Sequence, residues 1–205
     1  MSRKMKNEAT TTISCSDLIK FFSFIIKLKN IKRSGWISKV QVAEPESIAD
    51  HTFSVCAISM ILSDILGLDT EKIMRIAILH DLAESIVGDI MPDEMPKNEK
   101  LEKEKQAIKY VLSFLPKKNR DHYRSILNEF YSHRSIASEF VHNVDKFEMI
   151  MQGMQYYKTG YDFELIRPFI ESAIKFIKKK KTIKDDDLSN SNKMIFDLIK
   201  ILKST

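Results

Sequence analysis

Glycine and proline are scarce in this chain, and that scarcity restricts its fold more than any other feature. Among 205 residues there are five of each. They fall mostly between stretches whose apolar residues recur every three or four positions, the spacing that places side chains on one face of an α-helix. The abundant Ile, Leu, Lys and Glu also favour helix over turn-rich sheet. The sequence therefore predicts an all-α fold, a single bundle of about seven to nine helices.

The apolar repeats and their stop signals predict where the helices lie. A first helix is expected over 16–30, followed by a loop over 31–45 that carries isolated charges without periodicity. Ser47 and Asp50 resemble a capping box, which predicts a second helix that begins there and ends at Gly67. A third helix is expected from about residue 70, with His80 and Asp81 near its end. Further helices are expected at 99–115, 116–131, 136–157 and 161–180.

The chain divides into three expected parts. Residues 1–15 form a disordered leader, 16–160 the helical core, and 161–205 a C-terminal helical extension. A polar linker near 178–192 precedes a short terminal helix from Lys193. We expect one folded domain, because 205 residues with 43% hydrophobic content can bury one substantial core.

Charge and cysteine content narrow the function. Lys and Arg number 33 against 28 Asp and Glu, and the net charge of +5 fits an anionic substrate but is small for a nucleic-acid binder. Cys15 and Cys56 are too few for a disulfide framework, so a reducing, cytoplasmic setting is expected. No apolar run approaches the roughly 20 residues of a membrane helix, and residues 1–14 lack the apolar core of a signal peptide.

Two histidines and two aspartates form the group that points most directly to chemistry, and they are His51, His80, Asp81 and Asp145. They stand on three predicted helices, each beside apolar residues that must face the core. A buried carboxylate is costly without compensation. A divalent cation held by two carboxylates and two neutral imidazoles removes that cost for all four groups. Taken singly, each residue also fits an ordinary role as a capping residue, a helix-end pair or a core salt-bridge partner.

A site of this composition predicts a hydrolase. Nitrogen and oxygen ligands without thiolate suit one divalent ion among Co, Mn, Fe, Ni, Zn and Mg. Four protein ligands leave two positions of an octahedral ion for a water and a substrate oxygen. Water bound in this way is a usable nucleophile near neutral pH. We therefore expect metal-dependent hydrolysis with the ion as cofactor.

Short segments around these residues carry a family resemblance. Residues 46–51 and 80–89, with the later Asp145, resemble the H…HD…D signature of the HD superfamily. The loop 33–36, Arg-Ser-Gly-Trp, resembles that of its 5'-deoxynucleotidase branch, and the similarity covers about 18–157. The resemblance implies an all-α HD domain, one divalent metal, homodimers, and hydrolysis of deoxyribonucleoside 5'-monophosphates. It matches the family's metal ligands to His51, His80, Asp81 and Asp145.

The resemblance also implies roles for five further residues. Arg33 grips the substrate phosphate, which suits the planar fork of a guanidinium. Glu84 orients or deprotonates the nucleophile, and Asp89 borders the phosphate and sugar, where it protonates the leaving 5'-oxygen or rejects a 2'-hydroxyl. Trp36 contacts the sugar, although two residues separate it from the arginine here and none in the bacterial members. Glu129 falls at a sugar-contacting glutamate once one residue is inserted.

Other interpretations stay open from the sequence. Arg33 belongs to a basic run that also fits a solvated surface, Glu84 also fits a helix surface, and Asp89 also fits an ordinary turn. A second hypothesis is another HD activity, on a nucleoside triphosphate, a guanosine polyphosphate or a phosphate ester. A third is a basic helical protein that binds nucleic acid or a partner through the lysine run 178–181.

Overall fold

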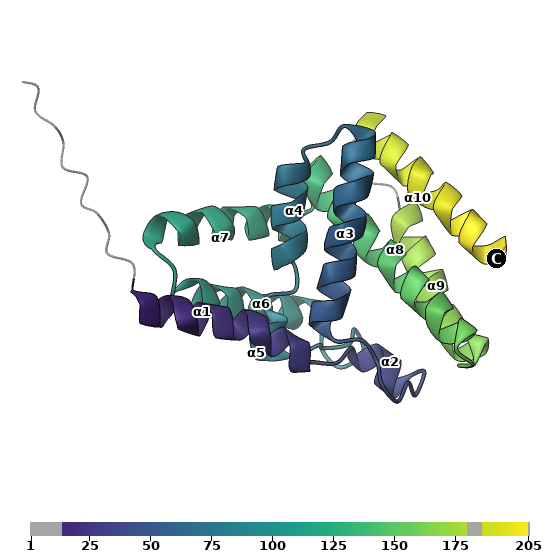
Figure 1. Cartoon of the computed structure of the whole chain (residues 1–205), viewed down its shortest axis with the longest axis horizontal. Helices are drawn as coiled ribbons and strands as arrows, with labels where there is room; N and C mark the ends of the chain where they lie inside the picture. The colour runs from purple at the N-terminus through teal and green to yellow at the C-terminus, as the bar shows by residue number, and fades with distance from the viewer. Residues whose placement is uncertain (1–13, 180–185, 205) are drawn as a thin grey trace, which may run out of the picture.

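The computed structural model describes residues 14–179 and 186–204, and these form a helical bundle (Figure 1). Within the described residues, β pairing is limited to one isolated bridge between Lys32 and Ser47. The predicted all-α class is confirmed. The helices are α1 (Cys15–Lys27), the short 3-10 helix η1 (Leu28–Asn30), α2 (Ser34–Ser38), α3 (Ile48–Leu66), α4 (Thr70–Leu79), α5 (Glu84–Val87), α6 (Lys97–Leu112), α7 (Lys117–Ser132), α8 (Ile136–Lys158), α9 (Phe163–Lys178) and α10 (Asp186–Ser204).

Helix α3 begins and ends where its sequence signals predict. The Ser47 side chain accepts a hydrogen bond from the Asp50 N–H, and the Asp50 carboxylate accepts one from the Ser47 N–H at 2.8 Å. At the other end Gly67 has a φ of 67°, a conformation that only glycine adopts at low cost. His51 therefore occupies the first turn of a helix whose start is fixed by local chemistry.

Helix α3 is the centre of the bundle. It packs against α4, α8 and α10, with α8, α9 and α10 on one side of it and α1, α5, α6 and α7 on the other (Figure 1). The buried apolar residues form two clusters. Val55 of α3 belongs to the larger cluster, with residues of α8 and α9, whereas Ile48 belongs to the smaller one, with residues of α1 and α6. His51 lies between these two residues along α3.

Two local expectations were wrong, each because a distant contact overrides the local pattern. The loop expected over 31–45 contains α2, whose first N–H is held by Asp89, 55 positions along the chain. The terminal helix begins at Asp186 instead of 193.

The early start of α10 has a visible cause in its packing. Apart from Leu188, residues 186–192 are polar and poor helix formers. Leu188 and Ser191 are nevertheless buried, and the Asn143 side-chain amide donates to Asn192 at 2.6 Å. Tertiary contacts therefore support helix where a linker near 178–192 was expected. The remaining part of that linker, 180–185, lies outside the described residues.

The structure describes only some of the three parts into which the chain was expected to divide. Helix α9 packs along α8 and adds Ile166 and Ile170 to the larger apolar cluster. The boundary at 160 and the C-terminal extension stay predictions. The leader, apart from its last two residues, lies outside the described part of the chain.

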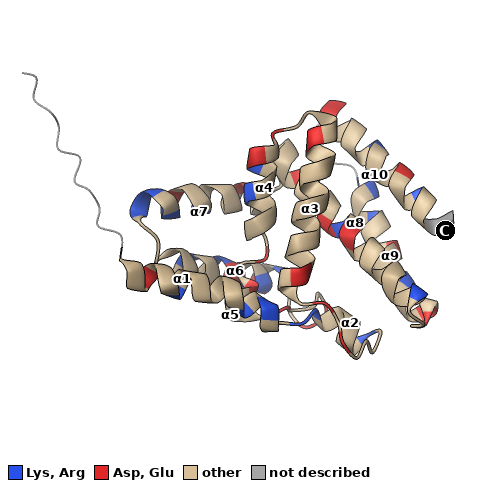
Figure 2. Cartoon of the chain, viewed as in Figure 1, with Lys and Arg blue, Asp and Glu red and all other residues tan. Residues whose placement is uncertain are grey.

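Charge and hydropathy separate the outer helices from the central one. Figure 2 shows Lys and Arg interspersed with Asp and Glu over the visible face. Among the described residues, α3 has the length and the mean hydropathy of 1.3 that a membrane-crossing helix can have, which the sequence analysis did not anticipate. One third of this apolar stretch is buried inside the bundle.

Candidate metal centre

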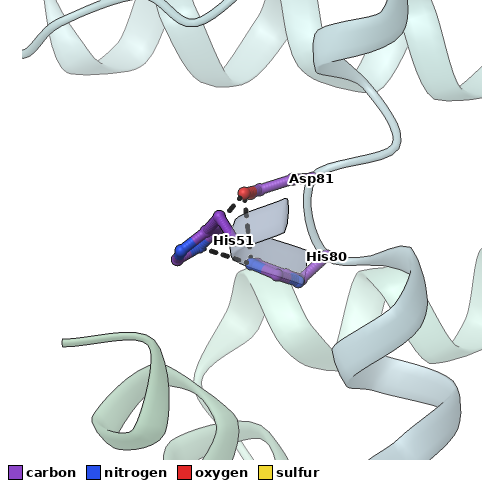
Figure 3. A group of neighbouring side chains, drawn as sticks. All are labelled: His51, His80 and Asp81. Atoms are coloured by element: carbon purple, nitrogen blue, oxygen red, sulfur yellow. Dashed lines mark hydrogen bonds and ion pairs between the residues drawn. The ribbon is translucent and has the colours of Figure 1, made fainter. Parts of the chain in front are cut away.

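His51, His80, Asp81 and Asp145 converge from three elements. His51 lies in the first turn of α3, His80 and Asp81 follow the last residue of α4, and Asp145 lies in α8. The His51 Nε2 atom is 3.4 Å from the His80 Nε2, 3.6 Å from an Asp81 oxygen and 3.3 Å from an Asp145 oxygen. Figure 3 shows the first three of these side chains pointing toward one another. The structure therefore brings all four predicted ligands together.

The second ring nitrogen of each histidine is held by a neighbouring acceptor. His51 Nδ1 lies 2.7 Å from a Glu148 oxygen, and His80 Nδ1 lies 2.6 Å from the Ala77 carbonyl. Because a carboxylate and a carbonyl only accept, each Nδ1 carries the hydrogen and donates it. Both Nε2 atoms are then directed at the cluster, the arrangement that orients metal-binding histidines.

The residues present fit a divalent cation. Within the described part of the chain, the Asp81 Oδ2 atom is buried and has no hydrogen-bond donor, although it lies 3.2 Å from the His80 Nε2. Two acceptor atoms this close repel each other unless a positive charge lies between them. Two imidazole nitrogens and two carboxylates are a suitable set for such an ion.

The electrostatics of the cluster also favour a positive charge at its centre. Burial and Arg33 lower the pKa of His51, but the Asp145 and Glu148 carboxylates outweigh them and raise it to about 10. Burial opposes ionisation of Asp145, yet Lys146 and His51 hold its pKa well below the usual range. A metal cation competes with the proton for the same place on the imidazole.

Arg33 borders this cluster from the loop before α2. One of its terminal nitrogens lies 4.0 Å from the Asp81 Oδ2, and its Nε lies 3.9 Å from a Glu46 oxygen. Burial lowers the pKa of Arg33, but the carboxylates of Asp89, Asp81 and Glu84 raise it above the usual value. The guanidinium is therefore permanently charged and faces the ligand side of the cluster.

Glu84 and Asp89 lie on the same side as Arg33. Glu84 is the first residue of α5 and is buried, with one carboxylate oxygen that has no donor among the described residues. Burial, with the charges of Asp81 and Asp89, holds the pKa of Glu84 well above its usual value. Asp89 accepts a 2.6 Å hydrogen bond from the Ser34 N–H, so it fixes the chain directly after Arg33.

Two predicted sugar contacts are not found. Trp36 is only 2% exposed, and its ring packs on Tyr156 and Phe169 at centroid distances of 5.2 and 4.6 Å, so it is a core side chain. Glu129 pairs with Lys72 at 2.6 Å, in the first turn of α4. That pairing lies two helical turns before His80. The structure does not bring Glu129 to the cluster.

Sequence reasoning missed three charged neighbours of the site. Glu148 follows Asp145 by three positions, and this helical spacing was the available signal. Glu46 lies in the segment before the capping box, and Lys146 donates to Asp145 at 2.8 Å. Glu46, His51 and Glu148 place one side-chain atom each within 4.8 Å of one another. Burial and the charge of Glu148 raise the pKa of Glu46 to about 7.

The fold and this His-Asp cluster define an HD-type protein, and a sequence model of the HD domain family matches residues 25–184. The chain belongs to the HD domain family. It is 35% identical over 157 residues to the 5'-deoxynucleotidase HDDC2 of Homo sapiens, and the match covers 76% of each chain. It is 34% identical over 144 residues to the 5'-deoxynucleotidase hdd1 of Schizosaccharomyces pombe, covering 68% of this chain and 72% of that one.

A solved structure has a similar fold over most of this chain. The crystal structure of the PH0347 protein from Pyrococcus horikoshii OT3 superposes with a TM-score of 0.71 at 31% identity. The match covers 91% of this chain and 96% of that one. The similarity therefore extends over most of the chain.

Proposed function

We propose that this protein is a metal-dependent 5'-deoxynucleotidase, a phosphoric monoester hydrolase that converts deoxyribonucleoside 5'-monophosphates to deoxyribonucleoside and phosphate. The observation that carries the proposal is the convergence of His51, His80, Asp81 and Asp145, with the Arg33 guanidinium 4.0 Å from Asp81. The 5'-deoxynucleotidases of about 35% identity support the substrate class.

The cofactor we propose is one divalent cation, drawn from Co, Mn, Fe, Ni, Zn and Mg, held by the two Nε2 atoms and the two aspartates. When bound, such a cation supplies positive charge to the phosphate oxygens and lowers the pKa of water at the site. The donor set of two nitrogens and two oxygens is compatible with each of these ions. Activity measured after substitution of each metal ion will rank them.

The chain's own residues perform the remaining work. Arg33 pairs with the phosphate oxygens and holds the phosphorus beside the cluster. Glu84 accepts a proton from the attacking water, a role that suits a buried carboxyl whose pKa is raised. The water oxygen forms a bond to phosphorus as the P–O5' bond breaks. The phosphate keeps one hydrogen of the water and Glu84 takes the other, while O5' gains one proton, for which Asp89 is the proposed donor. Glu84 then releases its proton to solvent and Asp89 takes one up, which restores both carboxyl groups.

The quaternary state we propose is a homodimer. Its subunit contact is an outer apolar face, formed by exposed side chains of α1, α3 and α4: Phe22, Ile25, Ile26, Phe53 and Ile78. Ile25, Phe53 and Ile78 line one hollow of this surface. Apolar groups gathered on a surface mark a site that another protein covers. The family resemblance of the 33–36 loop and the HD segments implies the same assembly.

The location we propose is the cytoplasm. Cys15 and Cys56 are both free thiols. Burial raises the pKa of Cys56 to about 11, which keeps it as an unreactive thiol. Free thiols are typical of reducing compartments. Fluorescence microscopy of the tagged chain checks this assignment.

The activity is tested by phosphate release from dAMP, dGMP, dCMP, dTMP and dUMP, compared with AMP, dATP and p-nitrophenyl phosphate. Each is measured with Co, Mn, Mg, Zn or EDTA. Asp145→Asn is the site variant, and Asp197→Asn on the surface of α10 is its control. We expect turnover of the deoxymonophosphates that EDTA and Asp145→Asn both abolish. Activity on dATP alone, or none with any metal, would assign the site to another HD reaction.

A further inference from the structure

Glu46 connects the phosphate-facing arginine to the only tryptophan of the chain. One oxygen of its carboxylate accepts the Trp36 indole N–H at 2.9 Å and lies 3.9 Å from the Arg33 Nε. We propose that Glu46 is a positioning residue, which holds Arg33 in the orientation that binds the substrate phosphate. This inference rests on the proposed function, in which Arg33 contacts the phosphate.

Glu46 is itself held in place on every side. Its side chain is 7% exposed. Its N–H donates to the Tyr156 hydroxyl at 2.9 Å, and its carbonyl accepts the Arg33 N–H at 3.1 Å. The next residue, Ser47, caps α3. The carboxylate therefore has a fixed position relative to both the arginine loop and the helix that carries His51.

Trp36 gives the carboxylate a rigid partner. The indole is wedged between Tyr156 of α8 and Phe169 of α9, and it donates its N–H away from this apolar contact. A Cβ added to Gly35 would lie 2.9 Å from the Phe169 ring, so only glycine lets the loop approach α9 this closely. The packing of Gly35 and Trp36 therefore gives the Glu46 carboxylate a fixed hydrogen-bond donor.

Glu46 and the carboxylates of the metal cluster attract different nitrogen atoms of the Arg33 guanidinium. Asp81 lies 4.0 Å from a terminal nitrogen, whereas Glu46 lies 3.9 Å from the Nε. Asp89, Glu84 and Asp145 also attract the guanidinium, so without Glu46 the remaining attraction is toward the cluster. Glu46 holds the Nε edge, so the two terminal nitrogens stay available for two phosphate oxygens. This role requires Glu46 in its carboxylate form, because a neutral partner exerts no comparable attraction on a buried cation.

The variant that tests this is Glu46→Gln, which keeps an oxygen for the Trp36 N–H and removes the charge. The control, Glu71→Gln, removes a charge from an exposed ion pair with Arg75 on α4. Two quantities are measured: the KM and kcat for dAMP, and the binding of inorganic phosphate followed by Trp36 fluorescence. Arg33→Ala and the double variant complete a mutant cycle. Thermal unfolding shows that each variant is folded.

We expect Glu46→Gln to raise the KM for dAMP and the dissociation constant of phosphate about 10-fold, while kcat changes less than about 3-fold. In the Arg33→Ala background the same substitution should change neither quantity. A purely structural role predicts equal losses in both backgrounds, and that result would overturn the proposal. So would a Glu46→Gln protein whose KM and phosphate affinity stay within twofold of wild type.

Failure of the proposed function gives a different result. In that case the wild-type protein releases no phosphate from dAMP and phosphate leaves its Trp36 emission unchanged. The positioning role of Glu46 then falls together with the activity. If the wild-type protein is active and only the Glu46 cycle fails, the activity stands and the positioning role alone is rejected.

Discussion

The two sides of α3 depart from the usual rule that polar residues are exposed and apolar residues are buried. One side buries a polar residue, and the other exposes an apolar one. His51, in its first turn, is 0% exposed, whereas Phe53, two positions later, is 74% exposed. Polar side chains lie inside mostly where a partner compensates them, and clustered apolar side chains lie outside mostly where another surface covers them. This contrast is why we assign the inner side of α3 to a cation and the outer side to a second subunit.

The two sides also differ in how they are built. On the inner side both metal-facing histidines have a set partner, His51 in Glu148 and His80 in the Ala77 carbonyl. On the outer side the apolar groups surround a hollow of about 450 Å³, and α1, α3 and α4 contribute its walls, including Phe21, Ile25, Leu28, Thr52, Phe53 and Leu79. Specific geometry suits an ion, and a broad apolar surface suits another protein.

The largest effect is expected from removing the central imidazole of the inner side. His51→Ala should lower phosphate release about 10³-fold or more, because His51 is in contact with both aspartates and with His80. Kinetics and metal content by mass spectrometry check this. His122→Ala, at an exposed position of α7, is the control and should retain both. Full metal content in His51→Ala would remove that residue from the ligand set.

A smaller effect is expected from the residue behind that imidazole. Glu148→Gln keeps the shape of the side chain but weakens its hold on the His51 Nδ1–H, so metal affinity should fall by about 10- to 100-fold. Competition with a chelating dye measures the affinity. His80 has no equivalent variant, because a backbone carbonyl orients it. Unchanged affinity would mean that the helix alone sets the orientation of His51.

The proposed subunit contact on the outer side is tested by placing a charge at Phe53, its most exposed aromatic residue. Phe53→Asp should convert the proposed dimer to a monomer at micromolar concentration, because burial between subunits strips water from the new carboxylate, a cost that Arg75 in the same hollow offsets only in part. Light scattering measures the mass. Leu165→Asp, on α9 and away from this face, should leave it unchanged. A wild-type protein that is already monomeric would reject the interface.

The sequence predicted the inner side of α3 better than its surroundings. His51 was placed correctly because the capping box, four adjacent residues, predicts the start of its helix. Gly67 likewise predicts the end of that helix from a local signal. Asp145 stood out as a charge within an apolar repeat. The packing of Trp36 and the ion pair of Glu129 could not be predicted, because their partners, Phe169 and Lys72, are distant in the chain.

The sequence could not predict the parts of the structure that depend on contacts between residues distant in the chain. The five-residue helix α2 depends on Asp89, and the orientation of Arg33 depends on Glu46, which a loop separates from it. Neither contact leaves a periodic pattern. The family resemblance supplied the residue roles, but it could not supply the hydrogen bonds that hold those residues.

The smallest expected effect tests whether the start of α3 acts only locally. Ser47→Ala removes the acceptor of the Asp50 N–H and should cost about 1 kcal/mol of stability, with a fall in Tm of about 2–4 °C. The activity should fall less than about threefold, because His51 is also held by Glu148. Ser54→Ala, later in α3, is the control, since its hydroxyl bonds only its own helix. A loss of metal along with the small loss of stability would show that the capping box, as well as Glu148, sets the position of His51.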